Sequence, residues 1–188
     1  GSVGDDESGT KAIEELAAAG VETDRVRAVP GAETAVKYLV VDHEGEVMVL
    51  SNAGANESFT AEHLTGGFDG VDEGTPAQRA GVDHLHLTSQ LPETAAELAE
   101  RAREAGASVS FDPGRRLGDR CYAQTLRHVD LLFLNRREAI ALVDSELDET
   151  LPDSASIVLK LGSEGAELHG PSVVRHGGFA VDPLDTTG

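Results

Sequence analysis

Short apolar runs alternate with amphipathic segments along the second half of the chain. The runs have the length and continuous apolar character of buried strands, and the segments between them place apolar residues at helical spacing. The predicted strands are 84–87, 107–111, 131–134, 157–161 and 166–169, and the predicted helices are 93–105, 121–128 and 136–143. This alternation predicts an α/β fold with a mostly parallel central sheet covered by helices on both faces.

The first half of the chain departs from this alternation. Residues 7–19 carry an apolar stripe at helical spacing and are followed by Gly20, which predicts a helix and its end. Residues 34–41 and 46–50 are strand-like and flank the turn sequence Asp-His-Glu-Gly, which predicts a β-hairpin. A hairpin inserted into an α/β body often serves as a lid or an interface. The predicted core is 1–27 and 52–188, and the predicted lid is 28–51.

Acidic residues dominate the composition. The chain has 34 Asp and Glu against 15 Lys and Arg, for a formal net charge of −19, and only three of the basic residues are lysines. Such a charge repels nucleic acid and anionic membranes, so we expect neither as a partner. Because salt screens repulsion between carboxylates, this balance favours a halophilic source over an ordinary acidic cytosolic protein.

Cysteine usage and hydropathy point to a cytoplasmic location. Cys121 is the one cysteine of the sequence, so no disulfide can form within the chain, which suits a reducing compartment. We interpret it as a small buried hydrophobe rather than a nucleophile. No apolar run approaches the length of a membrane span.

Chemically active side chains follow four consecutive predicted strands, where the ligands of open α/β sheets bind. The four segments are Asp112–Arg116, Asn135–Glu138, Lys160–Ala166 and Asp185–Gly188. Arginines suit phosphate or carboxylate groups, an Asn and a Glu one helical turn apart suit a hydrated Mg²⁺, and a glycine-rich turn suits an anion. Together these segments predict phosphoryl transfer.

Each segment also has a purely structural interpretation. Arg115 and Arg116 could be a solvated surface pair, Asn135 with Glu138 could cap a helix, and 162–165 could be a hairpin turn. The strand histidines His84 and His86 are better explained as hydrogen-bonded beside the core than as metal ligands. The order of the segments therefore carries more weight than any one of them.

That order resembles the ribokinase-like (PfkB) carbohydrate kinases over nearly the whole chain. The matching motifs are Gly1-Ser2-Val3-Gly4-Asp5-Asp6 with Gly9, Gly54-Ala55-Asn56, Asp112-Pro113 with Arg116, Asn135 with Glu138, Leu161-Gly162 with Gly165-Ala166, and Asp185-Thr186-Thr187-Gly188. The resemblance implies a three-layer ribokinase-like fold with a small β-sheet lid. Both ends of the chain stop within motifs of the family, so we expect truncation at each end.

The resemblance also implies an ATP-dependent sugar kinase that uses Mg²⁺ and phosphorylates a primary hydroxyl. The catalytic residues it implies are Asp185, Thr187 and Gly188. The general-base Asp is expected beyond residue 188, so we expect the chain as it stands to be inactive. The nucleotide site would use Asn135, Glu138, Lys160, Gly162 and Gly165, with Glu138 and Asn135 holding the metal through water. The substrate site would use Thr34, Asn56 and Arg116.

Several alternatives stay open at this point. Lys160 resembles the 2-keto-3-deoxygluconate kinases, whereas the lid strand lacks the Tyr and Arg with which they bind a carboxylate, so a neutral sugar of the ribose or ketohexose kind is favoured. A nucleoside kinase would need aromatic residues that this chain largely lacks, and a non-catalytic sugar or nucleotide sensor would lack the closing Asp. The family's lid often pairs with a second subunit, which implies a homodimer.

Overall fold

The computed structural model describes residues 1–43, 47–64 and 82–180. The chain divides into two compact units, 1–64 and 65–188, which we describe separately. The predicted catalytic residues Asp185, Thr187 and Gly188 lie outside the described residues, as does the centre of the predicted lid turn. The division into a kinase core and a lid stays a prediction.

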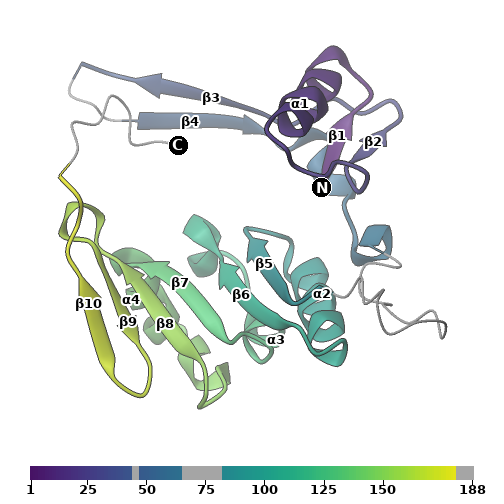
Figure 1. The fold of residues 1–188 in the computed structure, drawn as a ribbon. Helices are drawn as coiled ribbons and strands as arrows, with labels where there is room; N and C mark the ends of the chain where they lie inside the picture. The colour runs from purple at the N-terminus through teal and green to yellow at the C-terminus, as the bar shows by residue number, and fades with distance from the viewer. Residues whose placement is uncertain (44–46, 65–81, 181–188) are drawn as a thin grey trace. The chain divides into compact units, whose positions relative to one another are not determined.

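The second unit is built on a six-stranded sheet with the order β10-β9-β8-β7-β6-β5 (Figure 1). Its parallel strands are β5 (His84–Thr88), β6 (Ser108–Asp112), β7 (Leu131–Asn135) and β8 (Ser156–Lys160), and its antiparallel strands are β9 (Ala166–His169) and β10 (Val173–His176). The helices between the parallel strands are α2 (Pro92–Glu104), α3 (Ala123–Leu126) and α4 (Arg136–Asp144). The sheet is thus mostly parallel, as predicted.

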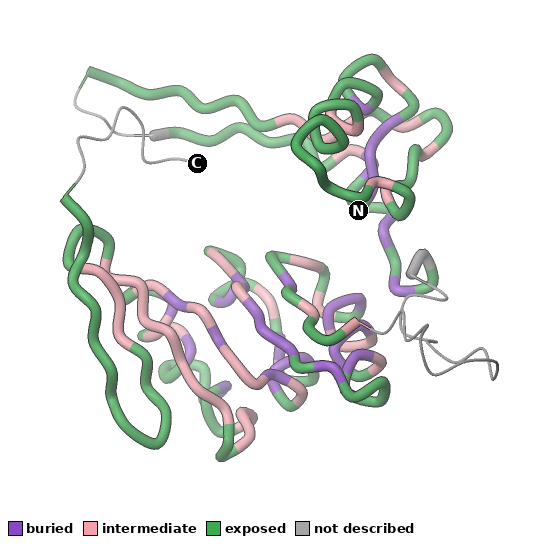
Figure 2. The backbone as a smooth tube through the Cα atoms, in the orientation of Figure 1, coloured by how far each residue is buried: buried purple, intermediate pink, exposed green. Residues whose placement is uncertain are grey.

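The described helices of this unit cover one face of the sheet. Each parallel strand lies beside the preceding one in the same direction, so right-handed crossovers place every connecting helix on the same side. The core includes Val109, Phe111, Leu132 and Leu134, which are fully buried. Figure 2 shows buried stretches of backbone along the central strands of the sheet. In the described part of the unit, the second helical layer that the sequence predicts is not seen.

The strand register brings the polar strand ends together at one edge. Thr88 pairs with Asp112 at the ends of β5 and β6, and Asn135 pairs with Lys160 at the ends of β7 and β8. Because these four strands are parallel, their carboxyl ends share this edge, which is the position predicted for ligands.

The first unit contains two small sheets and one helix. β1 (Ser2–Gly4) pairs in parallel with β2 (Arg27–Val29), and β3 (Val36–Val41) pairs with β4 (Val47–Asn52) as the predicted antiparallel hairpin. Helix α1 (Glu7–Ala18) follows β1, and Asp6 caps it by accepting a hydrogen bond from the Gly9 N–H. A short 3-10 helix, η1 (Gly54–Ser58), follows β4.

Four elements differ from the prediction. β1, β2 and β10 were not predicted, because runs of three or four residues are too short to show a strand period. Helix α3 spans four residues instead of eight, and the 3-10 helix η3 (Gly114–Gly118) lies in the loop before it.

Candidate functional site

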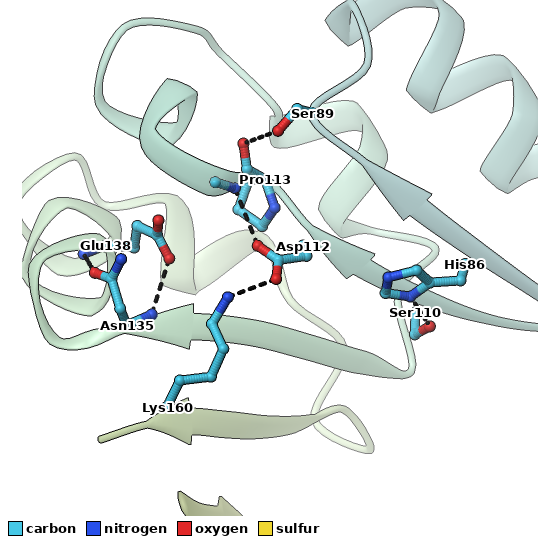
Figure 3. A network of polar contacts seen from close by, with 9 residues as sticks. His86, Ser89, Ser110, Asp112, Pro113, Asn135, Glu138 and Lys160 are labelled. Carbon is cyan, nitrogen blue, oxygen red and sulfur yellow. Dashed lines mark hydrogen bonds and ion pairs between the residues drawn. The ribbon is translucent and has the colours of Figure 1, made fainter. Parts of the chain in front are cut away.

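Asp112 and Lys160 form an ion pair at the carboxyl edge of the six-stranded sheet. The Lys160 Nζ lies 2.5 Å from Asp112 Oδ2, so the lysine side chain reaches across β7 (Figure 3). The other carboxylate oxygen, Oδ1, accepts a hydrogen bond from the Gly114 N–H at 3.2 Å. Asp112 therefore connects the end of β8 to the loop that follows β6.

Asn135 and Glu138 form a capping box at the start of α4. The Asn135 side chain accepts from the Glu138 N–H at 2.9 Å, and Glu138 Oε2 accepts from the Asn135 N–H at 2.8 Å. This is the structural alternative that the sequence left open. The capping box engages the single side-chain oxygen of Asn135 and one of the two Glu138 carboxylate oxygens. The predicted metal role is not tested by it and stays a prediction.

The donor set fits a metal that is held through water. Glu138 is only 5% exposed. Among the described residues, the one buried side-chain nitrogen or oxygen without a hydrogen-bond partner is Ser2 Oγ. Glu138 Oε1 therefore has either a hydrogen-bond partner or access to water. Residues 1–43, 47–64 and 82–180 hold no cluster of three or more His, Cys, Asp or Glu side chains suited to direct coordination. A carboxylate and an amide at a strand end suit a hydrated Mg²⁺, which retains most of its water ligands.

The glycine turn after β8 is packed tightly. Gly165 has φ +95°, and a Cβ there would lie 2.0 Å from the His176 carbonyl oxygen, so only glycine fits. Gly162 also has a positive φ, +61°, but its Cβ position faces open space. Arg136 at the start of α4 pairs with Glu164 of this turn at 2.9 Å. The turn is thus fixed against the end of β7, where nucleotide contacts from Lys160, Gly162 and Gly165 stay a prediction.

The loop after β6 carries three arginines with different environments. Arg120 Nη1 donates to the Gln90 carbonyl oxygen at 3.2 Å, whereas Arg115 and Arg116 are exposed and have no ion pair or hydrogen bond from their side chains within the described residues. The structure therefore leaves two guanidinium groups available at the strand-end edge.

The histidines of β5 are satisfied by serines. His84 lies 2.7 Å from both Ser108 Oγ and Ser110 Oγ, and His86 Nδ1 lies 2.7 Å from Ser110 Oγ. His86 also packs edge-on against Phe133. These contacts support the interpretation of hydrogen-bonded strand histidines. Cys121, in contrast, is exposed, so its predicted burial is wrong; the 3-10 helix η3 and the short α3 leave it in a surface loop.

In the first unit, Thr34 is held by Asp6. Its N–H and its hydroxyl donate to the Asp6 carboxylate at 2.8 and 2.5 Å, and the hydroxyl accepts from the Gly4 N–H at 3.0 Å. The Thr34 hydroxyl and N–H, with the Gly9 N–H, hold the pKa of the Asp6 carboxyl below its ordinary value. A sugar contact from Thr34 stays a prediction, and it would have to share this hydroxyl.

Asn56 is presented on η1 with its side chain exposed. The helix begins at Gly54, whose φ is +49° and whose Cβ would lie 2.3 Å from the Glu33 carbonyl oxygen. The Ala55 N–H donates to that same carbonyl at 2.8 Å, which fixes the turn next to Thr34. The structure thus brings the two predicted substrate residues of this unit onto adjoining segments.

Sequence reasoning missed the roles of Asp6, Ser89 and Asp112 as hydrogen-bond centres. Asp6 and Asp112 belong to motifs that were noted, but their partners lie 28 and 48 residues away in sequence. No local pattern indicates those partners. Ser89, discussed below, has no sequence signal of its own.

The carboxyl edge of this α/β sheet carries a carboxylate–lysine pair, an Asn–Glu capping box and two exposed arginines, which are the kinds of group that phosphoryl transfer uses. The chain belongs to the pfkB family of carbohydrate kinases, whose model matches residues 1–188. This confirms the predicted family and its α/β, ribokinase-like fold.

Relatives and solved structures agree with this family. The chain is 48% identical to an ATP-dependent ribose-1-phosphate kinase from the halophilic archaeon Halopiger xanaduensis, over all of this chain and 61% of that protein. It is 27% identical to the Bacillus subtilis ribokinase, of which it covers 62%. It superimposes on a putative ribokinase II from E. coli with a TM-score of 0.79 at 19% identity, over 100% of this chain and 64% of that one. The chain thus spans about three fifths of these relatives.

None of the described helices combines the length and apolar character that a membrane span requires. The source of the 48% identical relative accords with the halophilic character predicted from the charge.

The Asp6 contacts predict an acid-dependent loss of stability. Because the pKa of Asp6 is lowered by folding, its contribution is complete above the unfolded-state pKa of about 4 and is lost as pH falls through the lower, folded-state pKa. Asp6→Asn keeps one acceptor for the Gly9 N–H but loses an acceptor for Thr34. We expect the full-length protein to be more stable than this variant at pH 7, and the difference to shrink below about pH 4.

Urea unfolding of both proteins in high salt, from pH 7 to pH 3, measures this difference. Glu22→Gln, which alters an exposed carboxylate after α1, is the matched control and should show no such pH-dependent gap. A gap between wild type and Asp6→Asn that is constant with pH would contradict the assignment.

Proposed function

We propose that the full-length protein is an ATP-dependent kinase that phosphorylates the primary hydroxyl of ribose 1-phosphate in the cytoplasm. The observation that carries the proposal is the adjacent exposed arginines Arg115 and Arg116 at the strand-end edge of the sheet, whose side chains have no partner in 1–43, 47–64 or 82–180. The name of the 48% identical relative, a ribose-1-phosphate kinase, supports it.

Charge favours a phosphorylated sugar over a neutral one. The chain has 34 acidic residues for 15 basic ones, so an arginine on its surface has many potential partners. Arg101, Arg103, Arg136 and Arg175 form ion pairs with carboxylates. Of the described arginines without an ion pair, Arg115 and Arg116 are the two that are adjacent in the sequence. Two adjacent guanidinium groups that form none are suited to an anion from outside the chain, because the guanidinium fork matches the oxygens of phosphate.

The expected preference for a neutral sugar is therefore replaced in this proposal. That expectation relied on the lid strand, which offers no cation for an anionic substrate. The loop after β6 offers two cations, Arg115 and Arg116. A sugar acid such as 2-keto-3-deoxygluconate could also use Arg116, but with a single negative charge it would gain less from two guanidinium groups than a phosphate does.

The reaction moves one phosphoryl group. The bond between the γ-phosphorus and the oxygen that stays on ADP breaks, a bond to the sugar's primary hydroxyl oxygen forms, and the hydroxyl proton passes to a base. The resemblance assigns that base to an Asp after Gly188. Mg²⁺ would neutralise charge on the ATP phosphates. Among the described residues, Glu138 and Asn135 would hold its water shell, and Lys160 would approach the nucleotide once released from Asp112.

The predicted homodimer would use the β3–β4 hairpin. Tyr38, Met48 and Leu50, which share one face of this hairpin, are each more than half exposed, at 65, 57 and 55%. An apolar surface of this kind favours burial against another protein surface. We expect the full-length protein to sediment as a dimer in molar KCl, and Tyr38→Glu with Leu50→Glu to shift it to a monomer. A wild type that sediments as a monomer at micromolar concentration would contradict this.

The substrate is tested by comparing kcat/KM of the full-length enzyme for ribose 1-phosphate, ribose, fructose, 2-keto-3-deoxygluconate and inosine in molar KCl. We expect ribose 1-phosphate to be preferred at least tenfold, because a charged hydrogen bond contributes about 1.5–3 kcal/mol. Arg116→Gln should lower kcat/KM for the sugar phosphate about ten- to a hundredfold and leave the value for ribose nearly unchanged. A neutral sugar, a sugar acid or a nucleoside that wins by tenfold would overturn the proposal in favour of that alternative, and absence of any transfer would favour a sensor.

The metal role of Glu138 is tested by separating it from helix capping. Glu138→Gln keeps an acceptor for the Asn135 N–H and so preserves the capping box, but it removes the charge. We expect its Mg²⁺ requirement to rise about tenfold while its melting temperature stays close to that of wild type. Glu138→Ala should raise the Mg²⁺ requirement and, because it also removes the capping box, lower the melting temperature. If Glu138→Gln retains the wild-type Mg²⁺ dependence, Glu138 is a capping residue only.

A further inference from the structure

The loops that follow β5 and β6 are tied together by hydrogen bonds on both sides of η3. Before η3, the Ser89 N–H donates to the Asp112 carbonyl at 3.1 Å and the Ser89 hydroxyl donates to the Pro113 carbonyl at 3.2 Å (Figure 3). After η3, the Gln90 carbonyl accepts from Tyr122 Oη at 2.7 Å as well as from Arg120. The turn that carries Arg115 and Arg116 is thus held at both ends by residues 89 and 90.

Ser89 adopts a backbone conformation that is unfavourable for a serine. Its φ is +43°, and among the described residues only Glu146 is another non-glycine with positive φ. Such strain persists where surrounding contacts enforce it, and it is frequent at functional sites. Here the strained backbone aims the Ser89 N–H and hydroxyl at two successive carbonyls of the β6 loop. The positive φ of Ser89 therefore lets this residue hold Asp112 and Pro113 at the carboxyl ends of the strands.

Gly114 complements Ser89. It also has a positive φ, +59°, and a Cβ at this position would lie 2.9 Å from Ser89 Oγ. Any side chain at 114 would be strained and would also displace the hydroxyl that holds Pro113. The Gly114 N–H is fixed in turn by Asp112. The Ser89 hydroxyl thus occupies the space that a side chain at 114 would need, and we name this arrangement the Ser89–Gly114 lock.

The lock fixes the backbone from which the unpaired arginines project. Leu117, two residues after Arg115, is only 2% exposed and anchors the other end of η3. Between the lock and Leu117 the main chain has little freedom, whereas the side chains of Arg115 and Arg116 are exposed. A rigid backbone beneath two guanidinium groups reduces the entropy that is lost when they bind an anion.

We propose that Ser89 and Gly114 are positioning residues that preorganise Arg115 and Arg116 for the phosphate of the sugar substrate. This inference rests on the proposed function for the identity of the anion, but not for the existence of the lock. Neither residue touches the substrate; both act through the η3 backbone. Loosening the lock therefore weakens binding of the anionic substrate and leaves the chemical step and ATP binding unchanged.

Three variants of the full-length enzyme test the role of the lock. Ser89→Ala removes the hydroxyl and should raise KM for ribose 1-phosphate about three- to tenfold, the equivalent of one hydrogen bond, with kcat and KM for ATP unchanged. Ser89→Asn should recover most of this loss, because asparagine tolerates positive φ and its amide can donate to Pro113. Gly114→Ala should raise the same KM by at least as much as Ser89→Ala.

Gly106→Ala is the matched control for Gly114→Ala. Gly106 also has a positive φ, +83°, but its Cβ position meets nothing within 4 Å. Both alanine variants thus suffer backbone strain and should have lowered melting temperatures. Only Gly114→Ala should raise KM for the sugar phosphate. Equal KM values in the two variants would show that strain alone is responsible and would overturn the proposal.

Hydrogen exchange of peptides covering 112–120 separates the lock from the proposed substrate. Ser89→Ala should speed exchange in this segment about three- to tenfold, whichever substrate the enzyme uses. Unchanged exchange refutes the lock even if ribose 1-phosphate is the substrate. Faster exchange in Ser89→Ala, combined with a wild type that prefers ribose, keeps the lock but refutes the phosphate role, and with it the proposed function.

Discussion

The Asp112 carboxylate is the contact on which the strand-end edge depends. Asp112 is the last residue of β6. Its carboxylate accepts a hydrogen bond from the Gly114 N–H in the loop that follows and pairs with Lys160 at the end of β8. Register alone brings Asp112 beside Thr88 and Lys160 beside Asn135, but it does not fix the loops beyond the strands. The carboxylate does so, because one of its oxygens orients a loop and the other orients a lysine. Without this carboxylate, Lys160 would lose its ion pair and the Gly114 N–H would lose its hydrogen-bond acceptor.

Charge distribution separates structural from available cations in this acidic chain. The ion pairs Lys11–Glu15, Arg103–Asp130 and Arg136–Glu164 are exposed, so each contributes at most about 1 kcal/mol, and less in concentrated salt. Their main consequence is that the paired basic side chains are not available to bind a ligand. Arg120 is occupied by a backbone carbonyl, and Lys160 by Asp112. Arg115 and Arg116 have no ion pair or side-chain hydrogen bond among the described residues, and their turn is tied to the loop after β5 at both ends.

The sequence predicts the sheet well, since periodic apolar runs mark β5 to β9 and each glycine or polar break marks a turn. It places Asn135, Glu138, Lys160 and Arg116 near one another, because parallel strand ends share an edge. It does not predict which of them are already engaged. The Asn135–Glu138 capping box is local and was foreseen as an alternative, whereas the Lys160–Asp112 and Thr34–Asp6 contacts join distant segments. Positive φ at Ser89 follows from the tertiary contacts of its loop, so no propensity scale could indicate it.

The central claim is that the turn Gly114–Gly118 receives the phosphate of the sugar substrate. The most direct test is a crystal structure of the full-length protein, grown in molar KCl with ribose 1-phosphate and a non-hydrolysable ATP analogue. The account predicts that the 1-phosphate oxygens lie about 2.7–3.2 Å from the Arg115 or Arg116 guanidinium nitrogens, with the primary hydroxyl directed at the γ-phosphate. A sugar phosphate bound with its phosphate away from this turn, and with both arginines still solvated, would contradict it.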